Sequence, residues 1–154
     1  MRRWDEARDR IERSLELEPL SPSVYLTASN IEYFAGCHSR AIEHCCRALE
    51  FSPEHPLALS QMGWSCLRIG AFEEALTAME RSVQIAPDNS YFRWLLGYAY
   101  AVAGRVDGAR EMIRDLYARS EHQYVMPFGF AVIHAGLGER EKALDWLERA
   151  YEGR

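Results

Sequence analysis

The side chains of this chain that could bind a metal are concentrated in one short segment. They are Cys37, His38, His44, Cys45 and Cys46. Zinc accepts both cysteine and histidine in a tetrahedral site. However, Cys45 and Cys46 are adjacent, so on a helix their side chains point about 100° apart, and no paired-ligand spacing is present. We therefore expect these residues to serve in packing and at the surface, and we expect neither a metal nor another cofactor.

Candidate catalytic residues are scarce elsewhere in the chain. The sequence contains no P-loop, no His-Glu-x-x-His pair and no nucleophile elbow. His134 occupies an inward-facing position of its segment, where a hydrogen-bonded core histidine is the preferred interpretation over a catalytic base. The carboxylates are distributed as ordinary surface charge. We therefore expect a protein without enzymatic activity.

Four arginines follow one another along a single predicted helix, namely Arg105, Arg110, Arg114 and Arg119. Arg110 and Arg114 are four residues apart and share a helix face. A phosphate or an acidic partner could use that face, because guanidinium groups match the geometry of oxyanions. Acidic residues interleave with these arginines, so a solvated surface is the preferred interpretation.

Composition and charge exclude several classes of protein. The chain has 154 residues, of which 48% are hydrophobic and 27% charged, and this is typical of a folded domain. A formal net charge of -5 disfavours nucleic-acid binding through bulk positive charge. The longest apolar stretch, residues 94–104, is too short to span a bilayer. The four cysteines do not form a disulfide framework, so we expect a cytoplasmic protein. From the charge and the short apolar stretch we expect that it binds neither nucleic acid nor membrane.

The helices that position these residues are predicted by an internal repeat of 34 residues. Glycines follow this period at Gly36, Gly70, Gly104 and Gly138. Alanines follow it at Ala7, Ala41, Ala75, Ala109 and Ala143. Prolines follow it at Pro19, Pro53 and Pro87, and small residues at Ser29, Gly63, Gly97 and Ala131. Four independent series with one period indicate a repeat protein.

Each repeat is predicted to form two helices joined by a tight turn. Apolar or small residues at Leu59, Met62, Gly63 and Cys66 have the i, i+3, i+4, i+7 spacing of a helix. The periodic glycine allows the positive φ of a short turn, and the periodic proline ends the second helix. The periodic alanine and small residue allow two helix backbones to approach closely. The predicted fold is therefore all-α, with a helix A and a helix B in every repeat.

This pattern resembles the tetratricopeptide repeat, a helix-turn-helix unit of 34 residues. The predicted units are residues 22–55, 56–89, 90–123 and 124–154, and a helix B remnant at 2–21 precedes them in a single domain spanning 1–154. The resemblance implies a right-handed superhelical α-solenoid. The last unit is similar to the terminal repeats of large bacterial regulatory proteins.

Three residues depart from the repeat pattern. Glu32 stands where Tyr100 stands in a later unit, and Glu121 replaces the closing proline. Pro127 places the start of the last helix A nearer Met126 than Tyr124.

The resemblance also places a concave binding groove along the A helices. The residues predicted to form it are Leu26, Asn30, Tyr33, Leu57, Gln61, Trp64, Arg68, Tyr91, Trp94, Tyr98 and Phe128. Chaperone-binding members of the family hold a peptide's terminal carboxylate with Lys, Arg and Asn side chains. Asn30 matches one of these positions, but the others read Leu26, Gln61, Tyr91 and Leu95. We therefore expect an apolar or amphipathic peptide segment rather than a charged C-terminus.

Two functions remain open at this point. The first is a protein-interaction scaffold that binds a protein or peptide segment in the groove. The alternative is the regulatory segment of a larger bacterial signalling enzyme or transcription regulator, which would contact its own effector domain. The chain begins inside a repeat, and Leu144, Leu147 and Tyr151 face the place of a capping helix. We therefore expect either a fragment of a longer protein or self-association through the terminal helices.

Overall fold

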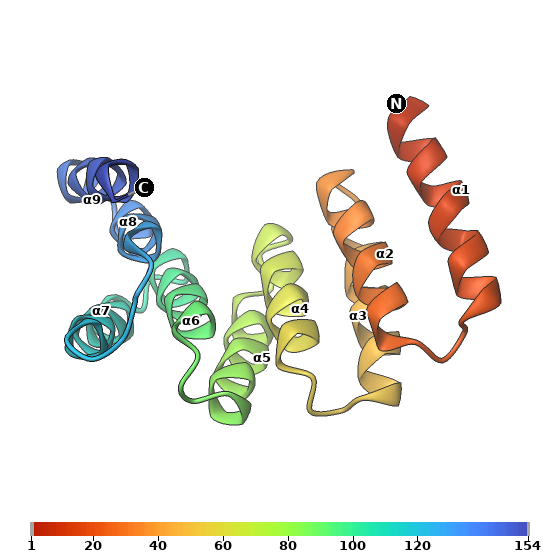
Figure 1. Cartoon of the computed structure of the whole chain (residues 1–154), viewed down its shortest axis with the longest axis horizontal. Helices are drawn as coiled ribbons and strands as arrows, with labels where there is room; N and C mark the ends of the chain where they lie inside the picture. The colour runs from red at the N-terminus through yellow and green to blue at the C-terminus, as the bar shows by residue number, and fades with distance from the viewer. Residues whose placement is uncertain (1, 154) are drawn as a thin grey trace. The chain divides into compact units, whose positions relative to one another are not determined.

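The computed structural model describes the backbone of residues 2–153, and all regular structure in that range is α-helical (Figure 1). The helices are α1 (Arg2–Leu17), α2 (Pro22–Phe34), α3 (His38–Phe51), α4 (Pro56–Arg68), α5 (Phe72–Ile85), α6 (Ser90–Val102), α7 (Val106–Ser120), α8 (Pro127–Gly136) and α9 (Arg140–Glu152). The chain forms two compact units, one ending at Ile85 with α1–α5 and one beginning at Ala86 with α6–α9. The all-α prediction is confirmed.

The four periodic glycines form the turns between helix A and helix B. Gly36, Gly70, Gly104 and Gly138 have φ values of 81°, 78°, 74° and 76°. The residue after each glycine donates its backbone N–H to a carbonyl in the last turn of helix A, for example Arg105 to Tyr100 at 2.8 Å. This is the Schellman arrangement, in which a left-handed residue closes the helix. A side chain at these positions would be strained.

The periodic small residues lie where helices cross. A Cβ added at Gly63 would lie 2.6 Å from Met79 Cγ, and one added at Gly97 would lie 2.7 Å from Ile133 Cδ1. Ala75 and Ala109 are fully buried. Close approach of the backbones therefore depends on these residue types, as the repeat predicted.

Proline marks the start of three helices, and α7 ends just before a position where the earlier repeats have proline. Pro22, Pro56 and Pro127 begin α2, α4 and α8 at the first helical position, where a missing N–H costs nothing. Helix α8 begins at Pro127 after an irregular segment, which agrees with the helix start predicted near Met126. Glu121 at the usual proline position caps α7 in a helical conformation.

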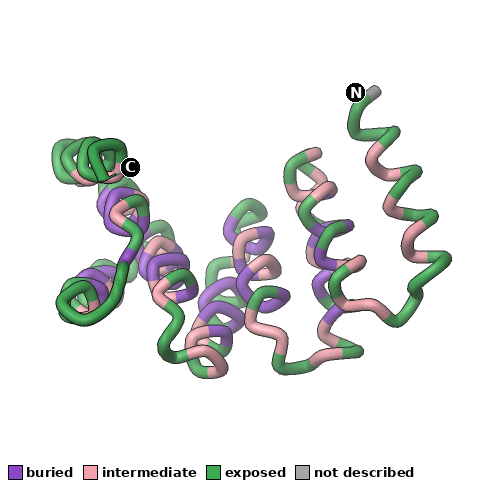
Figure 2. Tube along the Cα trace, viewed as in Figure 1, coloured by how far each residue is buried: buried purple, intermediate pink, exposed green. Residues whose placement is uncertain are grey.

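Each unit is held together by its own helix pairs. In the first unit α2 packs on α1, α3 and α4, and α5 packs on α4; in the second unit α6 packs on α7 and α8, and α8 packs on α9. Buried residues concentrate on the A helices and on the inner faces of the B helices (Figure 2). Among the described side chains, α1 has none that is buried and α9 has only Ala143.

Glu32 is a buried carboxylate at a repeat position that holds Cys66, Tyr100 and His134 in the later units. The residue is 2% exposed, and its carboxylate accepts two hydrogen bonds from Arg8 of α1, from Nε at 3.0 Å and from Nη2 at 2.8 Å. Arg40 Nη2 lies 3.2 Å from the same carboxylate. This ion pair joins α1 to the first full repeat.

Of the helices in the described range, none has both the length and the apolar character needed to cross a bilayer.

Candidate functional site

The predicted groove residues fall into two groups, one in each unit. Leu26, Asn30, Tyr33, Leu57, Gln61, Trp64 and Arg68 lie on α2 and α4 of the first unit. Tyr91, Trp94, Tyr98 and Phe128 lie on α6 and α8 of the second unit. Every one of these residues is on an A helix.

Three aromatic rings of the second unit form a continuous cluster. Tyr91 and Trp94 on α6 meet edge to face with ring centroids 5.3 Å apart, and Trp94 meets Phe128 on α8 edge to face at 5.9 Å. Edge-to-face contact is a favourable geometry for aromatic pairs. Tyr91 is 40% exposed and Phe128 is 43% exposed, whereas Trp94 is only 8% exposed. We call Tyr91, Trp94 and Phe128 the aromatic patch.

Trp94 is the buried base of this patch rather than its contact surface. A Cβ added at Gly129 would lie 2.8 Å from Trp94 Cγ, so the indole ring packs directly on the backbone of α8. Tyr98 lies one turn further along α6 and packs near Gly136. Trp94 therefore positions the two exposed rings, and a ligand on this face would meet mainly Tyr91 and Phe128.

A cavity of about 350 Å³ lies next to the aromatic patch. Its lining residues are Asp88, Asn89, Ser90, Tyr91, Trp94, Gln123, Tyr124 and Met126. Tyr124 and Met126 belong to the irregular segment before α8, and both are exposed apolar side chains. This volume is within the range of small ligand pockets in proteins. The cavity therefore extends the apolar surface of the patch toward its polar lining residues, Asp88, Asn89, Ser90 and Gln123, which we call the polar rim.

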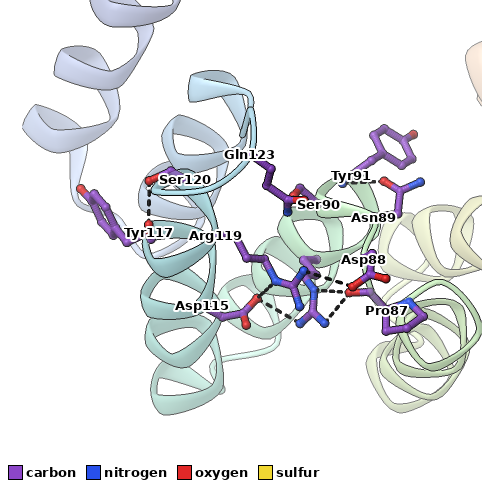
Figure 3. Close-up of polar contacts among 11 residues, drawn as sticks. Pro87, Asp88, Asn89, Ser90, Tyr91, Asp115, Tyr117, Arg119, Ser120 and Gln123 are labelled. Atoms are coloured by element: carbon purple, nitrogen blue, oxygen red, sulfur yellow. Dashed lines mark hydrogen bonds and ion pairs between the residues drawn. The ribbon is translucent and has the colours of Figure 1, made fainter.

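The polar rim is held in place by hydrogen bonds (Figure 3). Asn89 caps α6 by accepting from the backbone N–H of Tyr91 at 2.9 Å. Gln123 Nε2 donates to Ser90 Oγ at 3.0 Å. Arg119 Nε donates to Asp115 at 3.0 Å.

Arg93 ties the same rim to α7. Its guanidinium group donates twice to the Pro87 carbonyl oxygen, at 2.6 and 2.9 Å, and once to Asp115, at 3.0 Å. Burial raises the pKa of Tyr91, so its hydroxyl stays protonated at neutral pH and is available as a donor.

The first unit presents a more polar A-helix surface. Gln61 Nε2 on α4 donates to Asn30 Oδ1 on α2 at 3.2 Å, which joins two predicted groove residues. Leu57 and Arg68 are exposed, and Trp64 is half-buried.

Two other predicted residues of the first unit offer less surface. Leu26 is buried in the core with Ala48 and Ala58. Tyr33 is half-buried and packs edge to face on Phe34 at 5.4 Å.

The metal-capable residues of the first unit pack in other ways. No group of three His, Cys, Asp or Glu residues with metal-binding geometry occurs in the described part of the chain. Cys45 is buried, 3.0 Å from Ser29 Oγ, and burial raises the pKa of its thiol to about 11. His134, the candidate base of the second unit, is buried with Nδ1 2.6 Å from Glu139 Oε2. This is the satisfied core histidine that was expected.

Two features of the site were missed from the sequence. Tyr124 and Met126 precede the first turn of α8, but the repeat pattern carries no signal that both side chains are exposed beside the patch. Pro127 predicted only where the helix begins, because proline favours the first turn of a helix. The burial of Trp94 depends on Gly129, which is a glycine outside the 34-residue series.

Comparison with known proteins identifies the repeat. Residues 70–120 and residues 131–149 match family models described as tetratricopeptide repeat. A repeat-containing protein of this kind from Methanocaldococcus jannaschii is 21% identical over 128 residues, which cover 83% of this chain. The chain spans about a fifth of the length of that relative, since 22% of it is matched.

Solved structures share the fold. A thermophilic protein of the same repeat class from Thermus thermophilus superimposes with a TM-score of 0.79 at 19% identity, covering 97% of this chain and 82% of that one. YrrB, described as having an unusual peptide-binding site, gives a TM-score of 0.63 at 21% identity, covering 98% of this chain and 78% of that one. At these identities the likeness concerns the fold.

Proposed function

We propose that this chain, which is a tetratricopeptide repeat protein, is a non-enzymatic scaffold that binds an apolar or amphipathic peptide segment along its A helices. The aromatic patch of the second unit is the observation that carries the proposal. Tyr91 and Phe128 are each about two-fifths exposed on a rigid, buried Trp94. Exposed apolar surface of this kind commonly marks an interaction site, and Tyr is enriched at binding hot spots.

The polar groups near the patch suit a peptide backbone. In the second unit, Gln123 lines the cavity beside the patch and carries a side-chain amide. The A helices of the first unit carry an amide pair of their own, Asn30 and Gln61. Amides can donate to carbonyl oxygens and accept from N–H groups. Because the helices and their caps are fixed before binding, the scaffold loses little conformational entropy when a segment binds. YrrB, which has this fold, offers a precedent for peptide binding.

A peptide array tests this proposal. Twelve-residue peptides of zero net charge, graded in apolar content, are exposed to the purified chain, and binding is expected to rise with apolar content. For the best peptide, Tyr91→Ala and Phe128→Ala are each expected to weaken binding by roughly 2 kcal/mol. Binding that ignores apolar content, or that survives both substitutions together, would overturn the proposal. Trp94→Ala is expected to weaken binding to a similar degree, with a loss of thermal stability because this ring is buried.

The second candidate is a regulatory segment that contacts an effector domain of the same protein. It is favoured by the Methanocaldococcus jannaschii relative, which is much longer than the matched region. In that case the apolar segment would lie in the same polypeptide. The open reading frame around this chain distinguishes the two: an effector domain within it supports the regulatory function.

A further inference from the structure

A cavity of about 430 Å³ lies between the B helices α7 and α9 of the second unit, away from the aromatic patch. Four basic side chains line it, Arg110 and Arg114 from α7 and Lys142 and Arg149 from α9. A single carboxylate, Asp145, lines it with them. In a chain whose net charge is -5, this is a local concentration of positive charge. We call it the basic cavity.

The wall of the basic cavity is aromatic. Trp146 stacks on Phe130 with ring centroids 4.3 Å apart and an interplanar angle of 17°. Tyr117 meets the same indole edge to face at 5.7 Å. The Arg149 guanidinium lies 4.7 Å from the Trp146 ring centroid, which is a cation–π distance. Cations and a flat apolar surface are therefore side by side.

Two of the four cations are not neutralised by carboxylates. Glu139 lies 3.0 Å from Arg110 Nη2 and 3.3 Å from Lys142 Nζ, so these two cations share one carboxylate. Within residues 3–153, the side chain of Arg114 makes no hydrogen bond or ion pair, and the side chain of Arg149 makes only its ring contact. These two guanidinium groups are available to an anion.

The equivalent surface of the first unit is neutral. Moving each lining residue back by three repeat periods gives positions on α1, α2 and α3. The charged residues there are Arg8, Glu12, Glu32, Arg40, Glu43 and Arg47, three cations and three carboxylates. The basic cavity has four cations and one carboxylate at the same positions. Its charge is therefore specific to the last two repeats and is not a general property of B-helix surfaces.

The size of the basic cavity favours a short segment of chain. From Lys142 to Arg149 is seven residues, or about 10 Å of helix, which matches about three residues of extended peptide. A single phosphate group would reach only part of this length. The cavity has the volume of a ligand pocket and is too small for the interface of a folded domain.

We propose that the basic cavity binds an extended acidic peptide segment. Carboxylates of the segment pair with Arg114 and Arg149, because guanidinium groups bind carboxylates through two parallel hydrogen bonds. An aromatic or aliphatic side chain of the segment packs on Trp146. This site is distinct from the A-helix surface and takes a ligand of opposite character.

Fluorescence anisotropy tests this proposal with the labelled probe Glu-Glu-Phe-Glu-Glu. Arg114→Ala and Arg149→Ala are each expected to weaken binding by about tenfold, since each loses charge-assisted hydrogen bonds. The affinity is expected to fall as salt is added. Arg81→Ala is the matched control, because Arg81 is exposed and stands two repeats before Arg149. It is expected to leave the affinity unchanged.

Three results would overturn the proposal. The first is equal binding of the uncharged probe Gln-Gln-Phe-Gln-Gln, which would mean that charge is not recognised. The second is an equal loss in Arg81→Ala, which would mean that any surface arginine suffices. The third is displacement of the probe by inorganic phosphate at the probe's own concentration, which would indicate a small-anion site. Circular dichroism of each variant confirms that the helices are retained.

Discussion

The first and last junctions between repeats place an arginine at the same position but use it differently. The first junction, between α1 and α2, pairs Arg8 with Glu32, which is 2% exposed. The last junction, between α7 and α8–α9, pairs Arg110 with Glu139, whose side chain is 20% exposed. Arg8 and Arg110 are three repeat periods apart. The carboxylate comes from within helix A in the first case and from the start of helix B in the second.

The difference shows that an arginine at one repeat position can either hold two helices together or belong to a surface that is open to a ligand. Burial acts to raise the pKa of Glu32, but hydrogen bonds from Arg8 and the charge of Arg40 outweigh it and hold the pKa below its usual value. The pKa of Glu139 is lowered chiefly by its hydrogen bond with His134. The buried pair satisfies its charges internally. The exposed one leaves neighbouring cations open to a ligand.

The largest expected effect concerns the buried carboxylate. Glu32→Ala is expected to lower the free energy of unfolding by about 2–3 kcal/mol, because it removes the two charge-assisted hydrogen bonds that the buried carboxylate accepts from Arg8. Glu139→Ala is expected to cost about 1 kcal/mol or less, since solvent screens the more exposed pair. Urea unfolding followed by circular dichroism measures both.

A double substitution separates charge from volume in this first prediction. Arg8→Leu combined with Glu32→Leu is expected to recover most of the lost stability, because well-packed apolar residues can replace a buried ion pair. If Glu139→Ala costs as much as Glu32→Ala, then the distinction between the two junctions is wrong.

The next effect tests whether the helix crossings of the two units are equivalent. Ala41 and Ala109 are fully buried at the same repeat position. Replacing either with Leu is expected to cost on the order of 1–3 kcal/mol through overpacking. Thermal melting of the two variants should show similar losses. An unchanged melting temperature for Ala109→Leu would contradict the assigned repeat register.

The smallest effect is the response to pH. Burial lowers the pKa of His44 below 6.5, so protonation is resisted in the folded state and stability begins to fall as the pH drops below 6.5. The pKa values of Glu32 and Glu139 are also lowered, so their contribution is complete above pH 4.5 and is lost as the pH falls through their folded-state values. Urea unfolding at pH 7, 5.5 and 3.5 measures this decline.

His44→Gln is the matched variant for the upper part of this pH range. It is expected to flatten the decline between pH 6.5 and 5 and to leave the steeper loss below pH 4.5. The control is His122→Gln, which changes an exposed histidine. A decline of unchanged shape in His44→Gln would mean that another group titrates in that range.

The repeated backbone was predictable from the sequence because it imposes a local demand at a fixed interval. A left-handed turn needs glycine at Gly70 and Gly104, and a close crossing needs alanine at Ala75 and Ala109. Each demand is met by one residue type at one position, so the 34-residue period reveals it. Residues 70–120 match the family model for the same reason.

The site details were less predictable because they depend on pairs of residues far apart in sequence. Trp94 is buried by Gly129, and Glu32 is paired by Arg8, yet neither pair follows the repeat period. The basic cavity combines residues from α7, α8 and α9, so no motif spacing marks it. The repeat predicts which face a side chain occupies, but not what covers that side chain.

The central claim is that the aromatic patch binds an apolar segment, and one comparison tests it most directly. The affinity of the best array peptide is measured for the unmodified chain, for Phe128→Ala and for Arg114→Ala, at low and high salt. We expect a loss of roughly 2 kcal/mol in Phe128→Ala at both salt concentrations and no change in Arg114→Ala. A loss confined to Arg114→Ala, or binding that collapses with added salt, would contradict it.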